Sequence, residues 1–423
     1  MVKRIMLLPG VFLTAVQTDK FKTGCFSLNF LRPLCRQEAA ANALVPKILL
    51  RGSERYPDIP SVAAALDDLY GANVGALIRK KGEVQMTGFY ANFVEDRLTP
   101  EPVFVPVMEF VSEILLHPVL ENGAFRKDRF EAEKRNLLNA MEARINHKRS
   151  YANVCMLDVM CENEPYSIPR LGTQPELEVL DAAGLYAQYR KVLAESRVEL
   201  FYMGAKAPEE AADVLRRTLR ELPRADCFAQ AETTVIPQAV CVRSAEKHMD
   251  VTQSRLSLGL RTGCTVQDAE YPALVVMNAV FGGGMTSKLF TKLREEQSLC
   301  YYPASTVDKF KGLMIVYSDV ESDKLETTKT EILRQLEACR AGDISKDEFE
   351  SAKRVLLSDL KAAMDSPGRL EDFYLGQALL GSEGTTEALA DSIAAVTPEQ
   401  VQKAANRLTL DTVFFLKGRR HDP

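Results

Sequence analysis

An internal repeat constrains the fold of this 423-residue chain more than any other feature of its sequence. Segments 127–138 and 346–357 are identical at eight of twelve positions, at an offset of 219 residues. Apolar residues stay in step beyond them, as far as Ile145 and Met364, at the spacing that keeps one face of an α-helix apolar. We therefore interpret the chain as two halves that arose by duplication.

The pattern of elements agrees with two similar halves. Each half ends in a predicted helix, a strand and a glycine, at 185–193, 198–203 and Gly204 and again at 401–408, 412–417 and Gly418. Alternation of apolar and polar residues predicts further strands at 21–31, 83–91, 253–261 and 313–319. A helix over 61–70 is bounded by Pro60 and Gly71.

Strands grouped apart from helices predict an α+β fold, in which each half is a mostly antiparallel sheet with helices packed on one face. Pro223 and Pro237 punctuate a polar stretch without a long periodic segment. We therefore place an N-terminal half at 1–221, a linker at 222–238 and a C-terminal half at 239–423.

Composition excludes several classes of function. The formal net charge is −5, from 53 Lys and Arg against 58 Asp and Glu, so no basic surface for nucleic acid is expected. No apolar stretch is long enough to span a membrane. The nine cysteines are odd in number and form no C-x-x-C motif, which argues against disulfides and a zinc ribbon and predicts a cytoplasmic location.

The segment from Phe281 to Tyr301 carries the most specific motif, F-G-G-G-M-T-S-K-L-F-T-K-L-R-E-E-Q-S-L-C-Y. It resembles the C-terminal-half signature of the pitrilysin-type, or inverzincin, metallopeptidases, which include mitochondrial processing peptidase. Lys288 stands where that signature has Arg, and Ser298 stands where it has Gly. The resemblance implies the duplicated α+β architecture of that family over most of the chain.

In active members of that family, H-x-x-E-H on a helix holds zinc with its two His, the Glu acts as general base, and a later helix supplies a third ligand. The resemblance places the H-x-x-E-H positions at Ala43, Pro46 and Lys47, and the later ligand at Ala140 or its neighbour Asn139. None of these side chains can do the corresponding chemistry. The resemblance therefore implies that this chain has neither a zinc site nor catalytic residues.

The histidines support this without any alignment. The chain has four, at 117, 147, 248 and 421, and the closest two are 30 residues apart. Two His on one helical turn, as a zinc helix requires, therefore occur nowhere in the sequence.

The resemblance also implies a substrate-binding site in the C-terminal half, made by Arg294, Tyr301 and the glycines Gly282, Gly283 and Gly284. A tyrosine hydroxyl can hydrogen-bond a peptide carbonyl, and a guanidinium can bind peptide oxygens with two N–H groups. The alternative is structural: Arg294 would pair with one of the two glutamates that follow it, and Tyr301 would be half-buried in a strand.

The family resemblance implies a catalytically silent, substrate-binding subunit of a heterodimeric peptidase. Its partner would be a homologous subunit that bears H-x-x-E-H and zinc, and the two would enclose a peptide. The segment T-D-K-F-K-T at 18–23 and the degenerate helix resemble the inactive partner of a paired bacterial cytosolic peptidase, a type associated with elongation factor P aminopentanol modification.

Two other functions stay open. The chain could be a structural or peptide-binding scaffold, as the family's core subunits are in the respiratory bc1 complex. It could also be a stand-alone zinc peptidase with a shifted motif, against which the histidine spacing argues. The isolated chain could form a homodimer, since both halves descend from one unit.

Overall fold

The chain forms two compact units, each built around one β-sheet, in a computed structural model that describes residues 1–251 and 253–418. Unit 1 comprises Met1–Glu142, Ile168–Glu232 and Ser366–Glu383. Unit 2 comprises Ala143–Ser167, Thr233–Asp365 and the described part of Gly384–Pro423. Each unit thus contains a segment from the other end of the chain. The halves predicted at 1–221 and 239–423 were defined by the sequence repeat, whereas these units are defined by contacts. The units therefore do not test the predicted halves.

Unit 1 contains a six-stranded sheet in the order β1-β2-β8-β3-β5-β4. Its strands are β1 (Val2–Leu8), β2 (Val11–Gln17), β3 (Thr23–Pro33), β4 (Asn73–Lys81), β5 (Val84–Val94) and β8 (Arg197–Gly204). All neighbours are antiparallel except β2 and β8. A two-stranded sheet of β6 (Leu120–Glu121) and β7 (Ala124–Phe125) lies apart from it.

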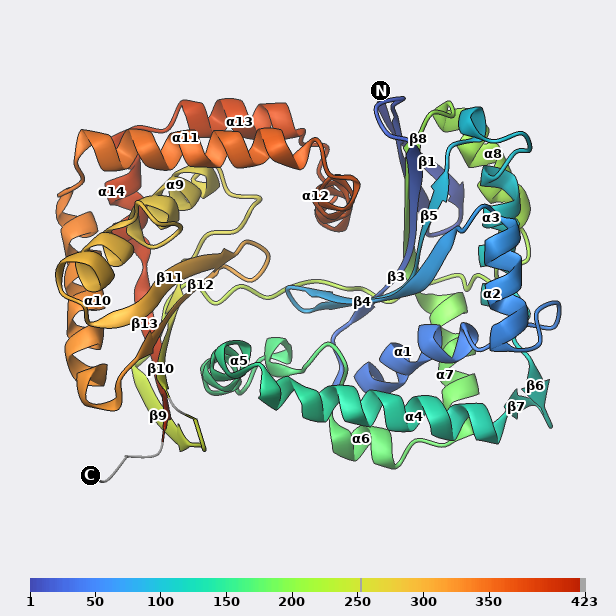
Figure 1. The fold of residues 1–423 in the computed structure, drawn as a ribbon, viewed down its shortest axis with the longest axis horizontal. Helices are drawn as coiled ribbons and strands as arrows, with labels where there is room; N and C mark the ends of the chain where they lie inside the picture. Colours follow the sequence, from blue (N-terminus) through green and yellow to red (C-terminus); the bar gives the residue numbers. More distant parts are fainter. Residues whose placement is uncertain (252, 419–423) are drawn as a thin grey trace. The chain divides into compact units, whose positions relative to one another are not determined.

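Most helices of unit 1 contribute to one large apolar core with the sheet. These helices are α1 (Arg36–Leu49), α2 (Ile59–Asp68), α3 (Phe104–Leu116), α4 (Lys127–Glu142), α6 (Gln174–Glu178), α7 (Ala182–Glu195) and α8 (Pro208–Thr218). In Figure 1, α3 and α8 lie on one side of β5 and β8. This is the helical layer that the sequence predicts.

A helix from the C-terminal half, α12 (Pro367–Leu380), covers the other face of the unit 1 sheet (Figure 1). Leu370 packs with Phe201 and Met203 of β8. The buried carboxylate of Glu371 accepts hydrogen bonds from Ser27 at 2.7 Å and Arg79 at 2.6 Å. Apolar packing and this buried ion pair together fix α12 on the sheet.

Unit 2 contains a five-stranded sheet in the order β11-β12-β10-β13-β9. Its strands are β9 (Arg243–His248), β10 (Ser254–Arg261), β11 (Cys300–Asp308), β12 (Leu313–Val320) and β13 (Thr409–Lys417). Only β13 and β9 are parallel. The predicted mostly antiparallel sheets are thus confirmed in both units.

The core of unit 2 lies between this sheet and five helices. They are α9 (Tyr271–Phe281), α10 (Leu325–Ala341), α11 (Lys346–Ala363), α13 (Thr386–Ala394) and α14 (Pro398–Arg407). On the opposite face, α5 (Lys148–Met160) contacts β10 and β13. A Cβ atom on Gly259 would come within 2.5 Å of the sulfurs of Met156 and Met160, so this glycine allows α5 to approach the sheet closely.

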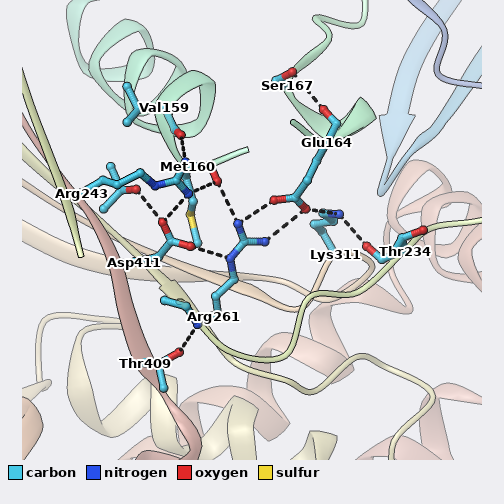
Figure 2. A network of polar contacts seen from close by, with 12 residues as sticks. Val159, Met160, Glu164, Ser167, Thr234, Arg243, Arg261, Lys311, Thr409 and Asp411 are labelled. Carbon is cyan, nitrogen blue, oxygen red and sulfur yellow. Dashed lines mark hydrogen bonds and ion pairs between the residues drawn. The ribbon is translucent and has the colours of Figure 1, made fainter. Parts of the chain in front are cut away.

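A buried ion network fixes the segment after α5 to unit 2, and Figure 2 shows its members. Glu164 accepts from Arg261 at 2.6 Å and from Lys311 at 2.6 Å. Arg261 also donates to Asp411 at 2.9 Å, and Asp411 accepts from Arg243 at 2.8 Å. The side chains of Arg261 and Lys311 are 2% and 0% exposed, so these charges depend on each other for compensation.

The helices repeat at the offset found in the sequence. α4 and α11 begin at Lys127 and Lys346, and α5 and α12 begin at Lys148 and Pro367, in both cases 219 residues apart. The duplication itself stays a prediction. None of the helices in the described part of the chain is both long and apolar enough to cross a membrane.

Candidate functional site

The glycine-rich loop begins where α9 ends. The carbonyl of Gly282 accepts a hydrogen bond from the amide of Ser305 on β11 at 2.8 Å. A Cβ on Gly282 would lie 2.6 Å from the Ser305 hydroxyl, and one on Gly283 would lie 2.8 Å from Cα of Ala279. Gly284 has no neighbour within 4 Å of such a Cβ. Gly282 and Gly283 therefore allow close packing of the backbone, whereas Gly284 makes no such close approach.

The hydrogen bond between Gly282 and Ser305 also occupies part of the edge of the unit 2 sheet. β11 is an edge strand, and the Ser305 amide that faces outward is already bonded to Gly282. Pro303, two residues earlier, faces the same edge and has no N–H group. An added strand would find few donors here, so this edge is protected against pairing.

Lys288 explains how the loop is held to the helices. Its side chain is 5% exposed and lies 3.0 Å from the Glu348 carboxylate of α11. The other oxygen of Glu348 accepts the amide of Ser345 in the capping box of that helix. The buried cation at this position of the signature thus fixes the loop to the N-terminus of α11.

Arg294 lies on a turn of π-helix that spans Phe290–Glu296. Its guanidinium carbon is 4.8 Å from the ring centre of Phe290 and 5.5 Å from that of Tyr301. Within the described part of the chain it makes no hydrogen bond or ion pair. Arg294 does not pair with Glu296, which binds Lys292 at 2.6 Å. Two aromatic rings therefore hold a guanidinium whose N–H groups are available.

Tyr301 is presented by a β-bulge. The register between β11 and β12 shifts between Cys300 and Tyr302, so Tyr301 has no partner residue on β12. Its side chain is 66% exposed, and it is not half-buried as the structural alternative requires. Tyr302 packs edge-on against Phe290 instead, with ring centres 6.5 Å apart. The structure thus brings Arg294 and Tyr301 together and presents both to solvent.

The neighbouring thiol is not set up for nucleophilic chemistry. Burial raises the pKa of the Cys300 thiol, and a hydrogen bond with Ser318 and the positive charge of Arg294 do not outweigh this shift. A thiol with a raised pKa stays protonated at neutral pH and is a poor nucleophile.

Ser298 adopts a left-handed conformation between Arg294 and Tyr301, with φ of +48°. This is the position at which the family signature has glycine, because glycine adopts such a conformation without steric cost. We expect Ser298→Gly to raise the free energy of unfolding by up to about 1 kcal/mol and the melting temperature by about 2 °C. Thermal denaturation checks this, with Ser298→Ala as the control that should give no gain. Equal gains in both variants would contradict the assigned strain.

In unit 1, the predicted H-x-x-E-H positions lie on α1, a helix as the family pattern requires. Ala43 is fully buried in the core, Pro46 is buried within the helix, and Lys47 is half-buried in its last turn. These side chains offer a methyl group, an aliphatic ring and an ammonium. None of the three can ligate zinc or act as a general base, so they do not fit the metal centre of active relatives.

The predicted later position, Ala140, lies on α4 and is exposed. The buried carboxylate of this helix is Glu133, two turns earlier, and it binds Arg51 and Asn136. Among the residues that the structure describes, no group of three or more His, Cys, Asp and Glu is placed to hold a metal ion.

β4 provides a different kind of feature in unit 1. It is an edge strand that pairs only with β5, and its backbone makes no other backbone hydrogen bond to described residues. Unlike β11, β4 contains no proline, and no described loop forms a backbone hydrogen bond with it. Open N–H and C=O groups on such an edge can accept an additional extended strand.

Comparison with known proteins places the chain in a family. Residues 180–356 match the model of the peptidase M16 inactive domain. Over 97% of this chain and 96% of the relative, it is 31% identical to the "probable inactive metalloprotease YmfF" of Bacillus subtilis. The chain belongs to the M16 peptidase family. This confirms the family predicted from the glycine-rich signature, and the chain is a homologue of its inactive members.

Comparison with solved structures agrees with the fold. A conserved protein from Enterococcus faecalis is 30% identical and superposes with a TM-score of 0.91 over 100% of both chains. An M16 inactive-domain structure from Pseudomonas fluorescens, at 16% identity, gives a TM-score of 0.80 over 99% of this chain and 98% of that one. The α+β fold class predicted from the sequence is thereby confirmed.

Sequence reasoning found Arg294 and Tyr301 but missed what surrounds them. Nothing in the sequence indicates a π-helical turn, a bulge at Tyr301 or a stack between Phe290 and the guanidinium. The open edge of β4 was also missed, because the order of strands in a sheet depends on long-range pairing. The strand pattern at 83–91 predicts β5 but not which of its neighbours ends the sheet.

Proposed function

We propose that this chain is the non-catalytic, substrate-binding subunit of a peptidase whose other subunit is a homologue with H-x-x-E-H and zinc. The substrate is a peptide, and Arg294 and Tyr301 contact it. All nine cysteines are free, which supports a reducing, cytoplasmic location.

The observation that carries this proposal is the state of Arg294. An exposed arginine is ordinarily mobile and hydrated, whereas this guanidinium is stacked on Phe290 and Tyr301. Stacking orders the side chain before a ligand arrives and leaves its N–H groups without a hydrogen-bond partner among the described residues. Peptide carbonyl and carboxylate oxygens match the fork that these N–H groups form. The Tyr301 hydroxyl, exposed on the bulge, supplies an adjacent donor.

The chain's own residues account for binding and not for bond cleavage. Hydrolysis in this family requires an activated water, and the side chains at Ala43, Pro46 and Lys47 cannot hold or deprotonate one. The open edge of β4 in unit 1 separately supports peptide binding, since main-chain hydrogen bonds would hold an extended peptide regardless of its sequence.

Arg294→Ala is expected to lower kcat/KM of the assembled peptidase by about 10- to 100-fold, because a hydrogen-bonded charge contributes about 1.5–3 kcal/mol. The assay mixes the purified chain with each zinc-bearing M16 homologue of the source organism and follows cleavage of fluorogenic peptides. The isolated chain should show no activity.

Lys292→Ala is the matched control, because Lys292 is an exposed cation on the same turn and is engaged with Glu296. It should leave kcat/KM unchanged. Activity that survives Arg294→Ala would remove Arg294 from substrate binding. A stable assembly that cleaves no peptide would favour the structural scaffold instead, and chelator-sensitive cleavage by the isolated chain would favour the stand-alone zinc peptidase.

A further inference from the structure

Lys47 is a cation without a partner at the position of a former metal ligand. It is half-buried in the last turn of α1, four residues after the fully buried Ala43. Within the described residues it makes no hydrogen bond, ion pair or ring contact. A partly desolvated ammonium without compensation is unfavourable, so a negatively charged ligand at this place would be stabilised.

Arg36 at the start of α1 and Arg51, just beyond its end, are already paired with carboxylates. Arg51 binds Glu133 of α4, and Arg36 lies 3.9 Å from Glu176 of α6. Glu133, a buried carboxylate of α4, is engaged by Arg51, and no carboxylate among the described residues forms an ion pair with Lys47. The site retains one positive charge where active relatives hold a zinc ion.

α1 packs against β4 and β5, and Figure 1 shows it beside β4. Val74 and Ile78 of β4 pack on the same core as Ala43, so alternate residues of the open edge strand face the layer that contains α1. Lys80 lies on that same face by alternation, and its ammonium donates to the carbonyl of Ile168 at 3.3 Å.

The opposite face of β4 differs. Its cations, Arg79 and Lys81, are each bound by a carboxylate of α12, from Glu371 at 2.6 Å and from Asp372 at 2.5 Å. The cations on this face of β4 therefore already have carboxylate partners. A peptide added to β4 would direct every second side chain to that face.

From this we propose that Lys47 binds a carboxylate side chain of the peptide on β4, so that the chain selects peptides with an acidic residue. This inference rests on the proposed function and specifies its substrate class. A position that holds a metal ligand in active relatives would thus serve peptide recognition in this chain.

The test uses fluorescence anisotropy of the full chain with three labelled hexapeptide pools. Each pool is randomised at every position except one central residue, which is Glu, Gln or Lys. We expect the Glu pool to bind about 10-fold more tightly than the Gln pool, as a hydrogen-bonded ion pair allows, and this preference to weaken in high salt.

Lys47→Met should abolish the preference for Glu, Lys47→Arg should keep it, and Lys47→Glu should shift it to the Lys pool. The matched control is Lys403→Met, which removes an exposed lysine of unit 2 that has no partner among the described residues. Equal binding of the Glu and Gln pools would overturn the role of Lys47 while leaving peptide binding intact. Absence of binding by any pool would overturn the proposed function as well.

Discussion

Glu164→Gln is expected to lower the free energy of unfolding of unit 2 by about 3–5 kcal/mol. The substitution keeps the shape of the side chain but removes its charge. Arg261 would keep Asp411 as a counter-ion, which it shares with Arg243, whereas Lys311 would lose the carboxylate that it binds. Because the side chains of Arg261 and Lys311 are almost completely buried, water cannot replace the lost carboxylate.

Denaturant unfolding followed by hydrogen exchange of the peptide that covers α5 would measure this effect. Exchange localises the loss, because the network binds the end of α5 through the carbonyls of Val159 and Met160. Glu296→Gln is the control, since it breaks an exposed pair with Lys292 that contributes no more than about 1 kcal/mol. A loss for Glu164→Gln no larger than that of the control would show that the network does not stabilise unit 2.

The pH dependence of this difference follows from the pKa of Glu164. Burial alone would raise it, but hydrogen bonds from Arg261 and Lys311 outweigh burial, so the pKa of the carboxyl is lowered. A lowered folded-state pKa contributes stability above the unfolded value of about 4.3, and this contribution disappears as pH falls through the folded value. The advantage of the native protein over Glu164→Gln should therefore be full at pH 7 and shrink as the pH is lowered below about 4.

Gly88→Ala is expected to destabilise unit 1 by about 3 kcal/mol or more, because it overpacks the backbone in the middle of a sheet. A Cβ atom at Gly88 of β5 would lie 2.0 Å from the carbonyl oxygen of Leu28 on β3. That oxygen belongs to the backbone and cannot rotate away as a flexible side chain would. The two strands would have to separate, and hydrogen bonds of the ladder would be lost.

The midpoint of denaturant unfolding measures this second effect. Gly368→Ala in α12 is the control, because a Cβ there meets nothing within 4 Å and alanine favours the helix. The control should be neutral or slightly stabilising. An unchanged midpoint for Gly88→Ala would mean that the strands can relax around the new methyl group.

Much of this fold could be predicted because local patterns report it directly. The repeat at 127–138 and 346–357 lies on α4 and α11, and the alternating segments became strands of the two sheets. The signature from Phe281 to Tyr301 identified the family. In the structure, several of its residues make close contacts that few other residue types could make. Small deviations in it also had physical consequences, as the strained Ser298 illustrates.

The sequence alone determined which chemistry is absent from the family positions. Ala43, Pro46 and Lys47 lack metal-binding and proton-accepting groups whatever their surroundings. It also placed the predicted helices and strands to within a few residues of their observed bounds, because periodicity and capping residues act over a few neighbours. These properties are local, and therefore they can be read along the chain.

Only the tertiary structure decided the remaining features. Three features depend on residues distant in sequence, namely the exchange of α5 and α12 between units, the bulge that presents Tyr301 beside Arg294, and the open edge of β4. The same sequence would allow Arg294 to pair with a neighbouring glutamate or to stack on the rings of Phe290 and Tyr301. The difference lies in strand register and side-chain packing, which are set when the whole core of each unit assembles.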